Sequence, residues 1–414
     1  MIDVIHSWRG RTLPVLVLAV VIAITSSCGG SSAQTLTGTY KMGVLGPFSG
    51  PAAFVGDWYK HGVAVGLNEV NGSGSFKLET AYGDTSNDPV DALNAWHQVQ
   101  LQDPAFYLGP SGIVASAVLP LFDPANKPDF TLAGNAEYDH MPFKNVFRLS
   151  PSDSVLTVAM AGYALNKHLM NAVMMFSSGP GQQSEVQPIA DVFTAHGGKV
   201  LGTYVLSTNA TDFRSELTQA FALKPDVIFF SILPPQAQTL FTNWRQLGLP
   251  DVTWVGDDTV DINTVKAIGL STAAKDVVGL SGSPPSGQAY AHFLDVYEKV
   301  WNTRQPIQQS ANIYDSIIIA SLAMTAAGSS DPKVWVPMVT KVANPPGEMV
   351  YTYADGVAAL KAGKEINYEG AVGSDDFNQY HNVFSDYDAI QFDASGTVHT
   401  ILTLTQDQLA KLSA

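Results

Sequence analysis

The densest group of side chains that could do chemistry is an acidic run in the second half of the chain. Asp257, Asp258 and Asp261 are closely followed by Asn263, and side-chain oxygens of this kind can bind a cation. The run lacks the glycine and the distal glutamate of a calcium-binding loop, so we expect no metal there. For Asp258, a helix N-cap and a solvated surface position are the alternatives to a binding role.

Motifs that support catalysis are missing from the sequence. It has no Gly-x-Ser-x-Gly elbow, no His-Glu-x-x-His, no Walker loop and no Gly-x-Gly-x-x-Gly after the first predicted strand. The histidines are scattered without the spacing of metal ligands; they are His6, His61, His97, His140, His168, His196, His292, His381 and His399. We therefore expect a protein that is not an enzyme and has no cofactor, with a secreted hydrolase as a distant alternative.

Size and charge narrow the class of protein further. The 414 residues suggest two or three domains. Hydrophobic residues make up 46% and charged residues 14%, which is typical of neither a disordered chain nor a coiled coil. Acidic residues outnumber basic ones 37 to 22, for a net charge of −15, and no basic cluster interrupts them. Binding to nucleic acid or to an anionic lipid surface through the main body is therefore not expected.

The first segment predicts export and a lipid anchor. Arg9 and Arg11 precede an apolar run, residues 13–24, which is too short to span a bilayer as a helix. Small residues then lead to Cys28, the only cysteine. This arrangement resembles a bacterial lipoprotein signal over residues 1–27, with Cys28 as the lipidated first residue of the mature chain. The alternative is a plain cleaved signal. Residues 28–38 read as a flexible tether because they are mostly small and polar.

Two successive α/β units must position the candidate residues. The first predicts strands at 42–45, 76–80, 106–108 and 130–133. A helix lies between each pair of strands. The first carries Val63, Leu67 and Val70 on one face, the second begins at Asp88 and Pro89, and the third extends from Val114 to Phe122. Alternation of strand and helix predicts a parallel sheet with helices on both faces.

A second unit of similar size and order follows Arg148. A helix at about 154–167 precedes predicted strands at 172–176, 199–205, 227–231, 253–255 and 277–280. The remainder carries helices but few strands, so we expect it to return to the first unit. Ligands of open α/β sheets bind beyond the carboxyl ends of the strands, and here those loops are rich in Gly, Pro, Ser, Asp and Asn. Two such loop sets facing each other would form a cleft.

Taken in order, the loop sequences resemble the branched-chain amino acid (Leu/Ile/Val) binding proteins, type I periplasmic solute-binding proteins of ABC transporters. The matching segments extend over about 40–400 and are Lys41 to Ala52, Gly62 to Ala64, Asn68 to Asn71, Asp84 to Pro89, Gly109 to Ser111, Val146 to Asp153, Asp212 to Phe213 with Leu217, Lys224 to Ile228, Gly256 to Asp258, Tyr314 to Asp315 and Tyr368 to Gly370.

The resemblance implies two doubly wound parallel-sheet lobes joined by a three-crossing hinge that closes on ligand. Lobe I would comprise 39–150 plus 282–385, and lobe II 151–281 plus 386–414. The resemblance, together with the donors and the carboxylate that a zwitterionic ligand requires, gives six candidate ligand-binding residues in the loops. They are Phe54, Ser111, Gly112, Ala133, Asn135 and Asp258. Asp258 matches the acidic residue that holds the ammonium group in relatives, so its loss should weaken an amino-acid ligand by ~10–150-fold.

Most of these positions also have ordinary structural explanations. Ser111 is also placed to be an N-cap, Phe54 to pack between lobes, and Asn135 to form an Asx turn. Tyr314 and Asp315 are expected to be structural.

Departures from the family leave the ligand open. Relatives that bind leucine commonly have paired serines where this chain has Pro110-Ser111-Gly112, and a tyrosine where it has Pro180. An amino acid, an amide or urea-like compound, or an aromatic acid therefore stays possible as the small-molecule ligand. The expected function is capture and delivery to the permease subunits of an ABC importer, by a monomer anchored through lipid at the outer face of the cytoplasmic membrane or in the periplasm. The alternative is a ligand sensor of the same fold that signals to a membrane partner.

Overall fold

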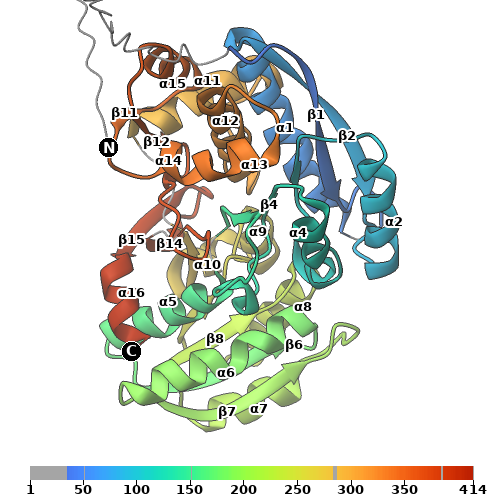
Figure 1. The fold of residues 1–414 in the computed structure, drawn as a ribbon. Coiled ribbons are helices and arrows are strands. Elements are labelled where there is room, and N and C mark those ends of the chain that lie inside the picture. The colour runs from blue at the N-terminus through green and yellow to red at the C-terminus, as the bar shows by residue number, and fades with distance from the viewer. Residues whose placement is uncertain (1–34, 51, 151, 283–286, 384–385, 414) are drawn as a thin grey trace, which may run out of the picture.

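The computed structural model describes residues 35–413 except 51, 151, 283–286 and 384–385. Cys28 and the predicted signal and most of the tether lie outside these residues. Two bodies, each built around its own sheet, lie one above the other in Figure 1. None of the described helices is alone long and apolar enough to cross a membrane. The helix α12 (Ser310–Ala327) and the segment Pro332–Ala343 would pass that test only together, and they meet at a 93° bend.

The first sheet is entirely parallel and forms the centre of lobe I. Its order is β2-β1-β3-β4-β5. The strands are β1 (Gly38–Gly46), β2 (Phe76–Asp84), β3 (Phe106–Leu108), β4 (Asp129–Thr131) and β5 (Val146–Arg148). Apolar clusters on both faces of this sheet form the core of the lobe.

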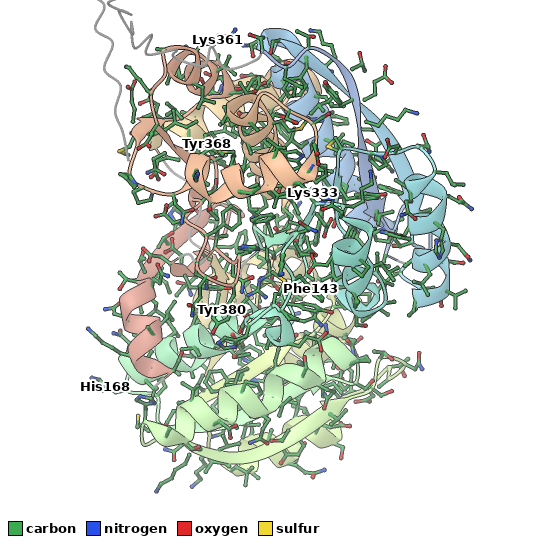
Figure 2. The ribbon with its side chains drawn as sticks, viewed as in Figure 1. Phe143, His168, Lys333, Lys361, Tyr368 and Tyr380 are labelled. Carbon is green, nitrogen blue, oxygen red and sulfur yellow. The ribbon has the colours of Figure 1, made fainter. Side chains whose placement is uncertain are left out.

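The helices of lobe I come from two separate parts of the chain. They are α1 (Ala53–Ser73), α2 (Pro89–Gln100), α3 (Ala115–Val118), α4 (Phe122–Ala125), α11 (Gly287–Trp301), α12 (Ser310–Ala327), α13 (Pro332–Trp335), α14 (Val339–Ala343) and α15 (Tyr353–Lys361). A small sheet of β11 (Glu348–Val350), β12 (Ile366–Gly370) and β13 (Gly373–Ser374) accompanies them. Its central strand carries Tyr368, labelled in Figure 2, which is fully buried in the core of the lobe.

Glycine allows the central helix α12 to approach α1 closely. A Cβ atom on Gly62 would lie 2.6 Å from Cβ of Ile313, and one on Gly66 would lie 2.7 Å from Cδ1 of Ile317. The two glycines are four residues apart and therefore share one face of α1. α12 is buried on nearly all sides, which explains why its apolar residues do not form a single stripe.

The second sheet forms the centre of lobe II, in the order β15-β14-β10-β9-β8-β6-β7. The strands are β6 (Asn171–Ser177), β7 (Lys199–Leu206), β8 (Val227–Ser231), β9 (Thr253–Gly256), β10 (Val277–Gly282), β14 (Tyr387–Phe392) and β15 (Val398–Leu404). The first five are parallel, and β14 and β15 extend the sheet in antiparallel fashion. The covering helices are α5 (Asp153–Asn166), α6 (Pro180–Ala195), α7 (Arg214–Ala222), α8 (Pro234–Gln246), α9 (Ile262–Ile268), α10 (Leu270–Asp276) and α16 (Gln406–Leu412).

Two details refine the sequence analysis. The helix predicted from Val114 to Phe122 lies within the helical segment Gly112–Ala125, in which α3 and α4 alternate with the 3-10 turns η1 (Gly112–Val114) and η2 (Leu119–Leu121). Pro120 and Pro124 lack the N–H that a continuous α-helix requires. Six strands, β5 and β11–β15, were also not predicted; most are short or lie at a sheet edge. The N-cap prediction at Asp88 is correct, because its side chain accepts hydrogen bonds from the N–H groups of Val90 and Asp91.

Candidate functional site

Two cavities lie between the lobes, where the loops after β4, β5, β9 and β10 meet. Both are lined by segments of each lobe and both include Asp153. Two larger cavities lie within lobe I. The one of about 710 Å³ is lined by residues of 123–147 and 332–381, and the one of about 470 Å³ by residues of 326–366. Only the interlobe cavities would therefore change shape if the lobes moved, and we take them as the candidate site.

The larger interlobe cavity, of about 300 Å³, lies beside the hinge. Lobe II contributes Asp153, Leu156, Asp258 and Tyr387, and lobe I contributes Tyr290 on α11 and the segment 306–312 before and within α12. The Tyr387 hydroxyl donates a hydrogen bond of 3.2 Å to the carbonyl of Ser152. Aromatic, amide and carboxyl groups thus surround this space.

The smaller cavity, of about 230 Å³, lies between the loop after β4 and the starts of α5 and α6. Asn135 and Glu137 line it from lobe I, and Asp153, Ser184 and Glu185 line it from lobe II. The predicted ligand residue Asn135 is therefore brought to the cleft. Its side chain makes no capping hydrogen bond to the turn that follows it.

Asp153 is the residue common to both cavities. Ser152 caps α5 by accepting from the N–H of Ser154, and the N–H of Asp153 donates to the Gly134 carbonyl at 2.8 Å. Burial raises the pKa of Asp153 to about 6; Arg148 opposes this shift, and Asp139 and Asp257 add to it. The sequence analysis missed Asp153 as a site residue, although it ends one of the family-like segments.

The acidic run after β9 divides into three roles. Asp257 is 2% exposed and accepts from the hydroxyls of Ser231 and Thr259, each at 2.5 Å. Asp261 caps α9 by accepting from the N–H groups of Asn263 and Thr264. Asp258 has neither of these roles and lines the larger cavity. The N-cap alternative for Asp258 is wrong, because Asp261 is the N-cap of α9.

Asp258 is open to the cavity and yet enclosed by protein. Its side chain is exposed and lines the larger interlobe cavity. This enclosure raises the pKa of Asp258 to about 7, with Asp257 and Asp153 adding to the shift. A positive group placed in the cavity would stabilise the ionised form.

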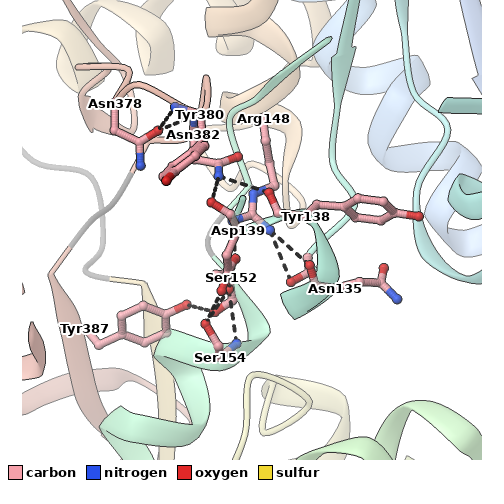
Figure 3. Close-up of polar contacts among 11 residues, drawn as sticks. Asn135, Tyr138, Asp139, Arg148, Ser152, Ser154, Asn378, Tyr380, Asn382 and Tyr387 are labelled. Carbon is pink, nitrogen blue, oxygen red and sulfur yellow. Dashed lines mark hydrogen bonds and ion pairs between the residues drawn. The ribbon is translucent and has the colours of Figure 1, made fainter. Parts of the chain in front are cut away.

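A polar network joins the cleft loops to the hinge (Figure 3). Arg148, at the end of β5, is fully buried and its Nη2 lies 2.5 Å from Oδ1 of Asp139. Its Nη1 donates to the carbonyl of Asn135 at 3.2 Å. The hydroxyls of Ser152 and Ser154 also donate to Asp139, at 2.6 and 2.5 Å.

The third segment of the hinge joins this network through backbone and amide groups. The N–H of Arg148 donates to the carbonyl of His381, and the N–H of Val383 donates to the carbonyl of Arg148. Asn382 donates to the carbonyls of Tyr138 and Asp139 at 3.0 and 2.9 Å. Segments more than two hundred residues apart in sequence therefore lie against each other beside the cleft.

Four other predicted residues do not line either cavity. Phe54, in the first turn of α1, is 59% exposed and packs edge-to-face on Trp58 at 5.8 Å. Ser111 and Gly112 begin η1, and Ser111 makes no capping hydrogen bond. Ala133 is buried, and its N–H donates to Thr131.

The remaining polar candidates of lobe I are internal. The Tyr314 hydroxyl donates to Oε2 of Glu69 at 2.6 Å, and Asp315 accepts from Tyr368 and from two backbone N–H groups, which agrees with their expected structural role. Within the described part of the chain, no three His, Cys, Asp or Glu side chains are arranged to hold a metal ion.

Comparisons with known proteins agree with this architecture. A family model described as periplasmic binding protein matches residues 39–397. An amino acid binding protein of Pseudomonas aeruginosa is 25% identical over 309 residues, which cover 70% of this chain and 79% of that protein. A Leu/Ile/Val-binding protein of Rhizobium johnstonii is 25% identical over 251 residues, covering 56% of this chain and 65% of that protein, slightly under two thirds of its length.

Solved structures give the same result at the level of fold. A leucine binding protein of Thermotoga maritima superimposes with a TM-score of 0.70 at 18% identity, covering 89% of this chain and 99% of that one. A solute binding protein of R. palustris in complex with benzoate gives 0.71 at 16% identity, covering 89% and 96%. These similarities confirm the two-lobed fold class predicted from the sequence.

Proposed function

Because the chain belongs to the periplasmic binding protein family, we propose that it captures a small polar molecule between its lobes and delivers it to an ABC importer. The observation that supports this most is the pair of cavities that both lobes line around Asp153. A ligand there would contact both lobes, so binding energy would favour closure. Proteins of this family act outside the cytoplasm, and the export signal predicted before Cys28 agrees with that location.

The lobe boundaries that we propose are 39–150 plus 282–385 for lobe I and 151–281 plus 386–414 for lobe II. The membership of β14 and β15 in the second sheet supports the last of these segments. The ligand contacts that we propose are Phe54, Ser111, Gly112, Ala133, Asn135 and Asp258, of which Asn135 and Asp258 have the best support because they line the cavities.

A thermal-shift screen of the mature protein tests the proposal. Amino acids, amides and aromatic acids are each titrated, since structures of similar proteins were solved in complex with isoleucine and with benzoate. A ligand that binds only the folded protein raises its melting temperature with concentration. If no compound in any class raised the melting temperature, the binding function would be refuted.

Delivery to an importer needs a separate test. If the neighbouring genes encode an ABC permease, purified ligand-loaded protein is added to vesicles that contain it. Uptake that depends on this protein would support transport. If the neighbouring gene instead encoded a membrane sensor kinase whose activity followed ligand binding, the sensor alternative would replace the transport role.

A further inference from the structure

Two buried carboxyl groups lie side by side in lobe I, next to residues that line the larger interlobe cavity. Asp315 on α12 and Asp375, directly after β13, are both fully buried. A Cβ atom on Gly370 would lie 2.0 Å from Oδ2 of Asp375 and 2.7 Å from Oδ2 of Asp315. Since one methyl group at Gly370 would collide with both carboxyl groups, the two occupy a single small space.

The two carboxyl groups differ in their hydrogen-bond partners. Asp315 accepts from the Tyr368 hydroxyl at 2.8 Å and from the N–H groups of Ala371 and Val372 at 2.9 and 2.8 Å. Neither oxygen of Asp375 has a hydrogen-bond partner among the described residues. An unpaired charge is costly to bury, far more so than a neutral polar group. Asp315 is therefore suited to be the ionised member of the pair, and Asp375 the protonated one.

Acidic and phenolic groups surround the pair. Burial raises the pKa of Asp375 well above its ordinary value, with Asp315 adding to the shift, and burial raises the pKa of Asp315 to about 7. His292 joins these groups only through Glu69, whose carboxylate lies 2.9 Å from its Nε2, so no described cation balances a second charge in the pair. The other titratable groups of the cluster are Glu69 on α1, Tyr314 on α12, Tyr368 and Glu369 on β12, and Asp376 after β13.

Asp315 connects the pair to the cavity wall. Its two backbone donors belong to the turn between β12 and β13, and in this turn and β13 Val372 and Ser374 line the larger interlobe cavity. The chain continues from Asp375 to Asn382, whose amide binds carbonyl groups of the cleft network. A change at the pair would therefore move a wall of the cavity and the start of the third hinge segment.

We propose that Asp315 and Asp375 form a pH-sensitive clasp, which holds residues 371–375 against α12 while Asp375 carries a proton and releases them when that proton is lost. A second negative charge beside Asp315 has no described cation to balance it, so the ionised segment gains stability when Asp375 moves into water. Asp315 and Asp375 position the cavity wall and do not themselves line it. The effect of the clasp on ligand affinity rests on the proposed binding function, whereas the clasp itself does not.

The direction of the pH dependence follows from the burial of Asp375. Its pKa is higher in the folded than in the unfolded protein, so its stabilisation is fully present below the unfolded value and is lost as pH rises toward the folded value. Between these two values the released form gains roughly 10-fold over the held form for each pH unit. The clasp is therefore closed in mildly acidic solution and opens as the solution becomes alkaline.

Urea denaturation of the mature chain from pH 5 to pH 9 tests the clasp. Asp375→Asn keeps the shape but cannot ionise, so its urea midpoint should depend less on pH than that of the parent and should exceed it at pH 9. Asp375→Val is a second variant in case the amide packs poorly, and it should show the same reduced dependence because Asp375 has no hydrogen bond to lose.

Glu79→Gln is the control for removing a carboxylate. Glu79 is exposed on β2, so this variant should keep the pH dependence of the parent. If both Asp375 variants also kept it, Asp375 would not be the group that titrates and the clasp would be refuted.

Hydrogen exchange followed by mass spectrometry shows whether the segment itself is released. Protection of the N–H groups of Ala371 and Val372, corrected for the intrinsic effect of pH on exchange, should fall at least roughly 10-fold between pH 5 and pH 8 in the parent. It should stay constant in Asp375→Asn, and the N–H of Ile317 inside α12 should stay protected in both proteins. Constant protection of Ala371 and Val372 in the parent would overturn the clasp, whatever a ligand screen shows. A clasp that passes both tests, together with a negative thermal-shift screen, would be supported while the binding function was refuted.

Discussion

Replacing Asp139 with asparagine tests how firmly the cleft loops are fixed to the hinge. Asp139 forms an ion pair with Arg148, whose Nη2 lies 2.5 Å from its carboxylate, and accepts hydrogen bonds from the hydroxyls of Ser152 and Ser154 (Figure 3). The asparagine keeps the shape and one acceptor oxygen but removes the charge. The fully buried guanidinium of Arg148 would then lack its counterion.

The expected cost follows from the burial of the two partners. The Arg148 side chain has 0% exposure and that of Asp139 has 18%. Removing one partner of a buried ion pair costs about 3–5 kcal/mol, because the other charge is left uncompensated. Partial exposure of Asp139 allows water to help, so we expect about 3 kcal/mol. An exposed ion pair stabilises the folded protein by at most about 1 kcal/mol. Lys60 and Asp57, whose side chains are 47% and 56% exposed, form such a pair and serve as the reference.

Urea denaturation of four proteins, with a fifth as control, measures the coupling. The set is the parent, Asp139→Asn, Arg148→Met and the double variant, with Asp57→Asn as the control for an exposed pair. We expect the double variant to lose less stability than the sum of the single losses, because it leaves no buried charge unpaired. If Asp139→Asn cost no more than Asp57→Asn, or if the single losses were additive, the reasoning about this network would be wrong.

Three further predictions concern the ligand, the pH dependence and the anchor. Asp258→Asn should weaken a bound amino acid by ~10–150-fold, measured by titration calorimetry, and an unchanged affinity would remove Asp258 from the site. His292 lies 2.9 Å from Glu69, and this hydrogen bond raises the pKa of His292; its stabilisation is therefore complete below the unfolded pKa and is lost as pH rises through the folded value. His292→Gln should accordingly cost about 1 kcal/mol at pH 5.5 and less at pH 8.5 in urea denaturation, and equal costs at both would contradict this. Cys28→Ala should release the protein from the membrane fraction, and unchanged membrane retention on immunoblots would refute the lipid anchor.

Local chemistry explains which parts of the fold were predictable from sequence. The apolar run of β6 and the Asp88–Pro89 helix start each depend on neighbouring residues, and both are where we expected them. The helix expected from Val114 to Phe122 is present, but 3-10 turns divide it because Pro120 cannot donate a backbone hydrogen bond. Antiparallel β14 and β15 were missed because only the pairing of β14 with β10, and of β15 with β14, reveals them as part of the second sheet.

The candidate site was predictable only where one residue type stood out within a motif. Asp258 and Asn135 were expected in the cleft and line its cavities. Asp153 and Glu185 were missed because they line the cavities from the starts of α5 and α6, and no local spacing relates these positions to Asp258. The pairing of Arg148 with Asp139 depends on the hinge geometry in the same way.

The pairing of β10 with β14 sets an order on the assembly of the exported protein. β10 ends at Gly282, and its antiparallel partner begins only at Tyr387, after the chain has completed much of the other lobe. A polypeptide that emerges from its amino terminus therefore displays the edge of β10 unpaired until its last segment arrives. An unpaired edge is a template for pairing with other chains, so premature termination before residue 387 should favour aggregation over a smaller folded product.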